Sequence, residues 1–181
     1  MNHLARTIQI QQLMQKENAD WFLVTHLHHV RYLSGFTGSF AILLLHRDRR
    51  YILTDGRYSE QVVKEVRDYE AVIQGKRKEI EAIRDIIGDL TQQTLWFESD
   101  YFSVTRYSAL CEHIPAKSYV PKRGIVESLR CIKDEEEIAS IRHALQIAEE
   151  AFEKALSFIH EGMSERELAH FLLEAMWQRG A

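Results

Sequence analysis

Short apolar runs and longer periodic stretches follow one another along the first two thirds of the chain. Apolar runs bounded by polar residues, at Trp21–Thr25, Phe40–Leu45 and Tyr51–Thr54, are typical of buried strands. The polar turn at residues 47–50 joins the last two runs and predicts an antiparallel hairpin. Stretches in which apolar residues recur three and four positions apart, as at Lys78–Leu90, are typical of helices that cover a sheet.

This alternation of strands and helices predicts an α/β domain. About six strands interleaved with helices indicate a mixed sheet that has helices on both faces and that opens with the antiparallel hairpin. The remaining elements that the pattern predicts are strands at Tyr69–Ile73, Thr94–Phe97 and Lys117–Val120 and helices at Gln9–Asn18, Tyr58–Val66 and Ser103–His113.

The last third of the chain has a helical period throughout. Asp134-x-x-Glu137 is a capping box, and the apolar residues that follow it predict one long amphipathic helix that ends at position 159. After a glycine suited to a left-handed turn, Ser164-x-x-Glu167 begins a second helix. Each helix presents an apolar face that must be covered, yet no further strand follows. From the residues alone, we expect either an obligate oligomer or a fragment of a larger protein.

The balance of charge changes along the chain and argues against one class of partner. The 181 residues carry 23 basic and 27 acidic side chains, a net charge of −4, which argues against nucleic acid as the main partner. Residues 1–122 have a net charge of +1 and residues 123–181 a net charge of −5, so we place a domain boundary between them. With no apolar run of about 18 residues and no secretory leader, the sequence predicts a cytoplasmic protein without a membrane partner.

Three histidines close to the first strand are the richest candidate for metal chemistry. His26, His28 and His29 have side chains that bind transition metals, but zinc sites use three or four ligands and neither cysteine is near in sequence. Glu167 and His170 have the spacing of a di-iron pair, but such sites need a second pair, which this chain lacks. Motifs of serine hydrolases, P-loop NTPases and dinucleotide-binding enzymes are also missing. We therefore assign no metal ligand and no catalytic residue to this chain.

Two further groups of residues have open roles. Asp55 and the glycine after it place a sharp turn at a strand end, and the Arg57 guanidinium could then hold a carboxylate through two hydrogen bonds. Equally, Asp55 could cap the following helix and pair with Arg57 locally. Phe36 and Phe40 flank a glycine-containing loop and could line an apolar pocket or belong to the core.

Three motifs, taken in order, give the chain a family resemblance. They are Tyr32–Ser39, Thr54–Tyr58 and Leu129–Ile138, the last of which reads Leu-Arg-x-Ile-Lys-Asp-Glu-x-Glu-Ile. Together with the long helix that follows, they resemble the prolidases and aminopeptidases P. These are the Xaa-Pro peptidases of the creatinase and methionine aminopeptidase superfamily, and the resemblance extends from end to end.

The resemblance implies a fold for each region. Residues 1–122 would form the creatinase/prolidase N-terminal α/β domain, which is ribonuclease H-like, and residues 123–181 the first helices of a truncated pita-bread catalytic domain. Intact members bind two divalent metals, usually manganese or cobalt, through Asp, His and Glu side chains on strands that lie beyond the helices matched here. We therefore expect no cofactor in this chain and no Xaa-Pro hydrolysis by this chain alone.

The resemblance also implies a role for the first region. In the family this domain mediates subunit contacts, and its loops cover the partner subunit's active site and help to select short substrates. We therefore expect this chain to be the substrate-lid and oligomerisation part of a metal-dependent Xaa-Pro dipeptidase or aminopeptidase. We expect it to form a homodimer, and we expect the intact protein to act on short proline-containing peptides. Two alternatives stay open: a non-catalytic peptide- or protein-binding module of the same fold, and a creatine amidinohydrolase relative. The positions that match the lid are Phe36, Thr37, Gly38, Ser39, Arg57 and Tyr58.

Overall fold

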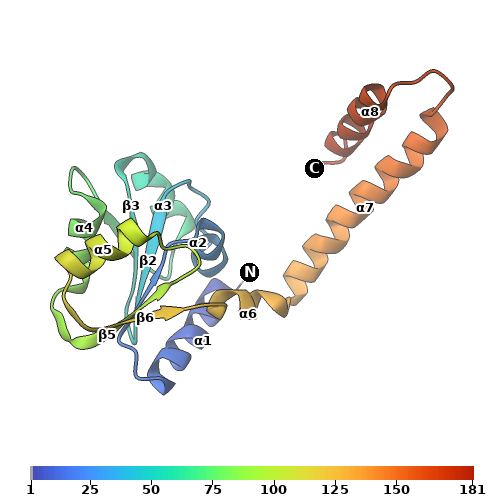
Figure 1. Cartoon of the computed structure of the whole chain (residues 1–181). Helices are drawn as coiled ribbons and strands as arrows, with labels where there is room; N and C mark the ends of the chain where they lie inside the picture. Colours follow the sequence, from blue (N-terminus) through green and yellow to red (C-terminus); the bar gives the residue numbers. More distant parts are fainter. Residues whose placement is uncertain (1) are drawn as a thin grey trace. The chain divides into compact units, whose positions relative to one another are not determined.

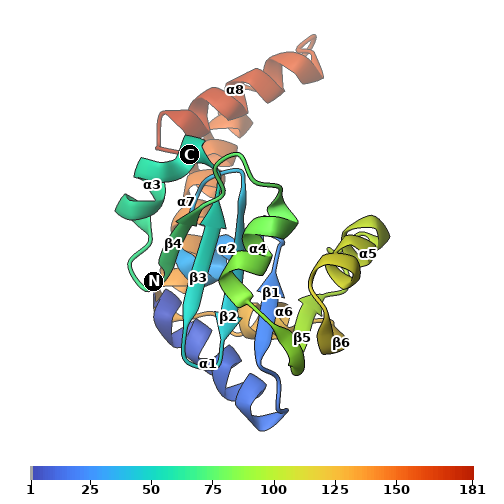
Figure 2. The same ribbon diagram turned by 90° about the vertical axis from the view of Figure 1, so that its left-hand side faces the viewer.

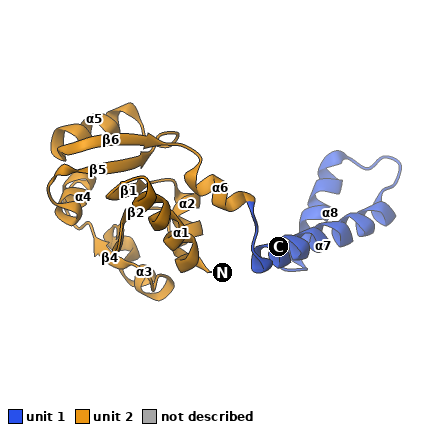
Figure 3. Cartoon of the chain, turned by 90° about the horizontal axis from the view of Figure 1, so that it is seen from below, with its two compact units in different colours: residues 1, 132–181 blue, residues 2–131 orange. Residues whose placement is uncertain are grey.

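The computed structural model describes residues 2–181, which form two compact units (Figure 3). In chain order, the first unit comprises residues 2–131 (orange in Figure 3, unit 2 of its key) and the second residues 132–181 (blue, unit 1 of its key). A sheet and the helices that cover it make up the first unit, and two long helices make up most of the second.

The first unit alternates helices and strands, as the hydrophobic pattern predicts (Figure 1). Its strands are β1 (Trp21–Val24), β2 (Ala41–His46), β3 (Arg50–Thr54), β4 (Glu70–Ile73), β5 (Leu90–Glu98) and β6 (Ala116–Lys122). Its helices are α1 (His3–Lys16), α2 (Leu27–Ser34), the short 3-10 turn η1 (Gly56–Tyr58), α3 (Ser59–Glu65), α4 (Glu79–Ile87), α5 (Val104–His113) and α6 (Ile125–Cys131).

The strands form one mixed sheet in the order β4-β3-β2-β1-β5-β6, and Figure 2 shows them side by side in this order. β1, β2 and β3 pair in antiparallel fashion, whereas β4, β5 and β6 each pair in parallel with their neighbours. Leu43 lies at the centre, opposite Val24 on one side and Ile52 on the other. The predicted α/β fold, with its mixed sheet and antiparallel hairpin, is confirmed.

Both faces of the sheet are covered, because successive side chains of a strand point to opposite sides. In β1, Phe22 and Val24 face a core layer built with α1, α2, α3 and α6, whereas Trp21 and Leu23 face α4 and α5. All four residues of β1 are therefore buried. Burial on both faces explains why the central strands are continuous apolar runs rather than alternating ones.

Helix α2 lies in a segment for which the sequence pattern predicts neither helix nor strand. It ends at Gly35, whose φ of 81° is left-handed. The helical period is weak in the sequence because polar histidines occupy the first turn. Val30 and Leu33 supply the face that packs on the core.

Helix α6 decides where the two units divide. Val126 is 1% exposed and lies in the same core layer as α1 and α2, with Ile125 and Leu129 packed against that layer. The division consequently falls after Cys131, later in the chain than the boundary at 122/123 that charge predicts. The shift in charge marks where the acidic helices begin, whereas the division depends on which apolar side chains α6 buries.

The second unit contains α7 (Glu135–Phe158) and α8 (Glu165–Trp177). Both predicted capping boxes form, because the side chains of Asp134 and Ser164 accept hydrogen bonds from the backbone N–H groups of Glu137 and Glu167. These caps fix the start of each helix locally, before any packing between the helices.

Side-chain contacts between α7 and α8 include a ring stack near the loop and an ion pair near the C-terminal end. The Phe158 and Phe171 rings stack with centroids 4.1 Å apart, and Arg179 Nε donates to Glu150 Oε2 at 2.5 Å. Small side chains such as Ala151 are buried between the helices.

Much of the apolar surface of these two helices remains exposed. More than half of each of the following residues is accessible: Ile141, Leu145, Phe152, Leu156, Ile159, Leu173 and Trp177. Packing of one helix on the other therefore leaves a large part of both apolar faces uncovered. Within residues 2–181, no helix has the length and apolar character needed to cross a membrane.

Candidate functional site

The loop of residues 36–39 and the start of α3 lie together at one end of the sheet. Phe36 is only 1% exposed, and its ring meets the Tyr58 ring edge-on at 5.6 Å between centroids. A Cβ added to Gly38 would lie 2.4 Å from Phe36 Cζ and 2.9 Å from Tyr58 Cδ1. Glycine at position 38 therefore allows the backbone to pass directly over the two rings.

Thr37 is fastened to the end of α3. Its backbone N–H donates to Glu65 Oε2 at 2.8 Å, and its hydroxyl donates to Glu65 Oε1 at 2.7 Å. Gln61 Nε2 completes this network of hydrogen bonds by donating to Thr37 Oγ1 and Glu65 Oε1. Partial burial opposes ionisation of Glu65, but the hydrogen bonds from Thr37 and Gln61 outweigh it and hold the pKa of this carboxyl below its ordinary value.

Ser39, at the other end of the loop, is hydrogen-bonded to Tyr58 of η1. Its hydroxyl lies 2.5 Å from the Tyr58 hydroxyl, and this hydrogen bond lowers the pKa of the Tyr58 phenol. Tyr58 is held in turn by its edge-on contact with Phe36. Successive loop residues are thus tied to the core, to α3 and to η1, which leaves the loop little conformational freedom.

Arg57 pairs with its own neighbour. Its Nε and Nη2 donate to the two carboxylate oxygens of Asp55 at 3.1 and 2.8 Å, and its backbone N–H donates to Asp55 Oδ1 at 2.9 Å. The side-chain hydrogen bonds hold the pKa of Asp55 below and that of Arg57 above their ordinary values. Of the two roles that the sequence left open, the structure forms the local one, with Asp55 as cap and partner.

The six lid positions that the sequence predicts therefore lie in one region, but their side chains differ in exposure. Thr37, Ser39 and Arg57 are exposed, Gly38 and Tyr58 are half-buried, and Phe36 belongs to the core. The surface that they present is one of hydrogen-bonding groups rather than an apolar pocket. An open depression lined by residues of η1 and α3, including Arg57, Lys64 and Glu65, lies beside it.

Sequence reasoning missed Glu65 and Gln61, which hold the loop. The one signal in the sequence is the position of Glu65 in the last turn of the predicted helix Tyr58–Val66. A carboxylate is unfavourable at that end of a helix dipole, so its presence there indicates another partner. The identity of that partner required the fold, because Thr37 is 28 residues away.

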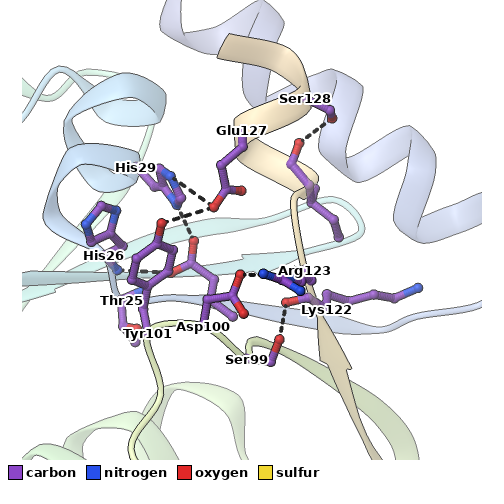
Figure 4. A network of polar contacts seen from close by, with 12 residues as sticks. Thr25, His26, His29, Ser99, Asp100, Tyr101, Lys122, Arg123, Glu127 and Ser128 are labelled. Atoms are coloured by element: carbon purple, nitrogen blue, oxygen red, sulfur yellow. Dashed lines mark hydrogen bonds and ion pairs between the residues drawn. The ribbon is translucent and has the colours of Figure 1, made fainter. Parts of the chain in front are cut away.

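The histidines form a second polar cluster, on the first turn of α2 (Figure 4). His29 is fully buried, and its Nδ1 lies 2.6 Å from Glu98 Oε1 at the end of β5. The His26 ring stacks on the Tyr101 ring at 3.8 Å between centroids. Burial, and after it the charge of His29, lower the pKa of His26. Glu127 of α6 completes the cluster.

The residues present do not supply the ligand set of a metal centre. Within residues 2–181, no three His, Cys, Asp or Glu side chains are arranged to hold an ion. His26 and His29 instead contact Tyr101 and Glu98, and Glu98 also accepts hydrogen bonds from two backbone N–H groups. The side chains of His26, His29 and Glu98 are therefore occupied by contacts within the protein.

Comparison with protein families divides the chain into two matched regions. Residues 6–132 match the Creatinase/Prolidase N-terminal domain, and residues 139–181 match the Metallopeptidase family M24. The first match covers the α/β unit, and the second covers most of the helical unit.

Individual relatives are about twice as long as this chain. The uncharacterized peptidase YqhT of Bacillus subtilis is 32% identical over 172 residues, which are 95% of this chain and 48% of YqhT. An Xaa-Pro dipeptidase from Bacillus anthracis superposes with a TM-score of 0.89 and 34% identity, over 99% of this chain and 50% of its own. The chain thus spans about half the length of these relatives.

A second solved structure matches the first unit by itself. It is the N-terminal, creatinase/prolidase-like domain of a putative metallopeptidase from Corynebacterium diphtheriae. The match has a TM-score of 0.60 and 34% identity, and it covers 68% of this chain and 98% of that domain. Its structure was solved as a separate domain, so a fold of this kind holds together without the helices that follow it here.

Proposed function

Because the chain belongs to the creatinase/prolidase N-terminal domain family and continues into the start of an M24 metallopeptidase domain, we propose that it is the N-terminal part of a metal-dependent Xaa-Pro peptidase. The observation that carries the proposal is the match of 99% of this chain to one half of the Bacillus anthracis dipeptidase. In this proposal the metals, manganese or cobalt, belong to the intact protein and activate water for peptide hydrolysis.

The uncovered faces of α7 and α8 support this assignment. Side chains such as Leu145 and Trp177 are more than half exposed, and exposed apolar faces of this extent are typical of surfaces that another part of a domain or another chain covers. The M24 match lies on these helices, and the relatives continue well beyond it. We infer that the rest of an M24 domain packs there in the intact protein.

The first unit contributes the lid and the subunit contact in this proposal. The loop that carries Thr37 and Ser39 presents hydrogen-bonding groups on a fixed backbone, which suits the polar ends of a short peptide better than an apolar side chain. Because the loop is held by Glu65 and Tyr58, it does not need to be ordered by substrate. We expect it to select substrates by position, across a dimer interface, rather than to take part in bond cleavage.

The coding sequence beyond residue 181 provides the first test. We expect it to continue in frame into strands that carry the Asp, His and Glu ligands of an M24 centre. A stop codon in their place would contradict the peptidase proposal and favour the non-catalytic binding module.

Turnover provides the second test. Residues 1–181 alone are expected to release no proline from Xaa-Pro dipeptides with added manganese, whereas the protein that includes the M24 strands should do so and should leave creatine intact. Creatine hydrolysis would favour the alternative relative, and metal-dependent turnover by residues 1–181 in proportion to protein would contradict the assignment of the metal site.

The lid role has its own measurement. In the longer protein, Ser39→Ala with Tyr58→Phe should raise KM several-fold with little change in kcat, because these groups bind but do not react. Glu60→Gln, on the same face of the unit but outside the loop contacts, is the matched control and should leave both constants unchanged. An equal KM for all variants would remove the lid from the proposal.

A further inference from the structure

We propose that the docking of α6 on the α/β unit is coupled to a proton on Nε2 of His29. Helix α6 is the last element of the first unit, and His29 lies on α2, against which α6 brings Glu127 (Figure 4). The inference is independent of the peptidase proposal, because every group that it uses belongs to residues 2–131.

One side of the imidazole is fixed by Glu98. This glutamate is 5% exposed, and its Oε2 accepts hydrogen bonds from the backbone N–H groups of Thr25 and His26 at 2.6 and 2.9 Å. Its Oε1 lies 2.6 Å from His29 Nδ1. With two backbone donors already on it, the carboxylate acts as acceptor, so the Nδ1 proton resides on the ring.

The other side of the imidazole has no hydrogen-bond partner. His29 Nε2 is buried, and the carboxylate oxygen Oε1 of Glu127 lies 3.7 Å away. Tyr101 donates its hydroxyl proton to the same oxygen at 3.2 Å. A ring nitrogen without a proton would direct its lone pair at this carboxylate, whereas a nitrogen with a proton faces an acceptor of opposite charge.

The two states of the ring therefore act on α6 in opposite ways. With a proton on each nitrogen, the imidazolium lies between Glu98 of β5 and Glu127 of α6 and attracts both. The ring and Glu98 are buried, whereas the Glu127 side chain is 36% exposed, so water screens the attraction to Glu127 more than the attraction to Glu98. With a neutral ring, Nε2 is a buried acceptor without a donor, which is unfavourable. Movement of α6 away from the ring would admit water, and a water molecule could then donate to Nε2. Docking and proton uptake thus favour each other.

The other charged groups around the ring are compatible with one positive charge at His29. On α2, His28 is exposed and His26 is shifted towards its neutral form by burial and by His29 itself. Beyond β5, Asp100 is paired with Arg123 Nε at 2.9 Å. On α6, Arg130 is near enough to disfavour a charge on His26.

Apolar packing sets the background for this coupling. Val126 is buried, and Ile125 and Leu129 pack against the same core layer. The helix is therefore held in both states of the ring, and the proton changes how often it detaches. When the proton leaves Nε2, the docked helix loses the attraction between His29 and Glu127.

Amide hydrogen exchange in residues 1–181 tests the coupling. After correction for the intrinsic effect of pH, exchange at Ser128 and Leu129 should become about tenfold faster between pH 5.5 and pH 8, whereas α5 should keep its protection. Protection of α6 that does not change over this range would overturn the proposal.

Two variants separate the coupling from a general loss of stability. Glu127→Gln supplies an N–H that donates to a neutral Nε2, so α6 should stay protected at pH 8 and its pH dependence should disappear. Glu112→Gln, an exposed change on α5, should leave the dependence of α6 as in the wild type. A dependence that survives Glu127→Gln would overturn the proposal, even if the variant folds normally.

Discussion

The two units of this chain differ in how completely they bury their apolar side chains. In the α/β unit, both faces of the sheet are covered, and residues such as Leu43 and Phe22 are at most 1% exposed. In the helical unit, Leu145 and Phe152 lie on regular, well-capped helices and remain more than half exposed. Regular secondary structure with good caps therefore does not by itself make a closed core. What closes a core is a second layer, and only the first unit has one.

The difference has an energetic consequence. Long helices gain most of their stability in proteins from packing of an apolar face rather than from helix propensity. The first unit obtains this packing from its own sheet, whereas α7 and α8 obtain only part of it from each other. We therefore expect the first unit to dominate the cooperative unfolding of the chain.

Truncation of one buried and one exposed leucine gives the largest expected contrast between the units. Leu43→Ala should lower the free energy of unfolding by about 3 kcal/mol, because it removes buried methyl groups and leaves a cavity in the core layer between the sheet and helices α1 and α2. Leu145→Ala should change it by less than about 0.5 kcal/mol. Urea unfolding of each variant at low protein concentration measures both values, and equal effects would mean that the second unit is closed in solution.

Self-association is the next largest effect. The uncovered stretches 138–159 and 168–176 should be buried between copies, so residues 1–181 should sediment above the monomer mass at micromolar concentration. Leu145→Glu with Leu173→Glu should restore the monomer, whereas Val63→Glu, at a still more exposed apolar position of the first unit, should not. A wild-type monomer that also fails to bind an apolar dye would contradict this expectation.

The smallest effect concerns the loop of residues 36–39 in the first unit and tests whether the Glu65 carboxylate holds Thr37 in place. The pKa of Glu65 is lowered in the folded protein, so its contribution to holding Thr37 is present above the ordinary pKa of a glutamate and is lost as pH falls through the folded value. The Thr37 amide proton should shift in NMR spectra over that acidic range. Glu65→Gln should abolish the shift and Glu60→Gln should keep it, and a shift that persists in Glu65→Gln would assign the effect to another group.

The sequence predicted those features that depend on residues close together along the chain. The central strands are apolar because they are buried on both faces, and the capping residues Asp134 and Ser164 act within one turn of their helices. α2 was missed because its helical face has only two core residues among histidines. The boundary predicted from charge differs from the structural division because charge does not register the burial of Val126.

The candidate site shows the same limit. Motifs identified the loop of residues 36–39 and Arg57, and in the structure this loop packs against Tyr58, the residue next to Arg57. Their environment was beyond the reach of the motifs: Phe36 belongs to the core, Arg57 is paired with Asp55, and Glu65 holds Thr37. These outcomes depend on residues that are far apart in sequence or on competition between nearby partners.

By itself, the sequence determined the order of strands and helices, the helix caps, the family resemblance and the two unsatisfied apolar faces, because each is written in residues close together along the chain. Only the tertiary structure decided which of the histidines is buried, that His29 lies between Glu98 and Glu127, and that α6 belongs to the first unit. These features bring together residues about 70 and 100 positions apart, and their energies arise from burial and charge at distances that a linear pattern does not contain.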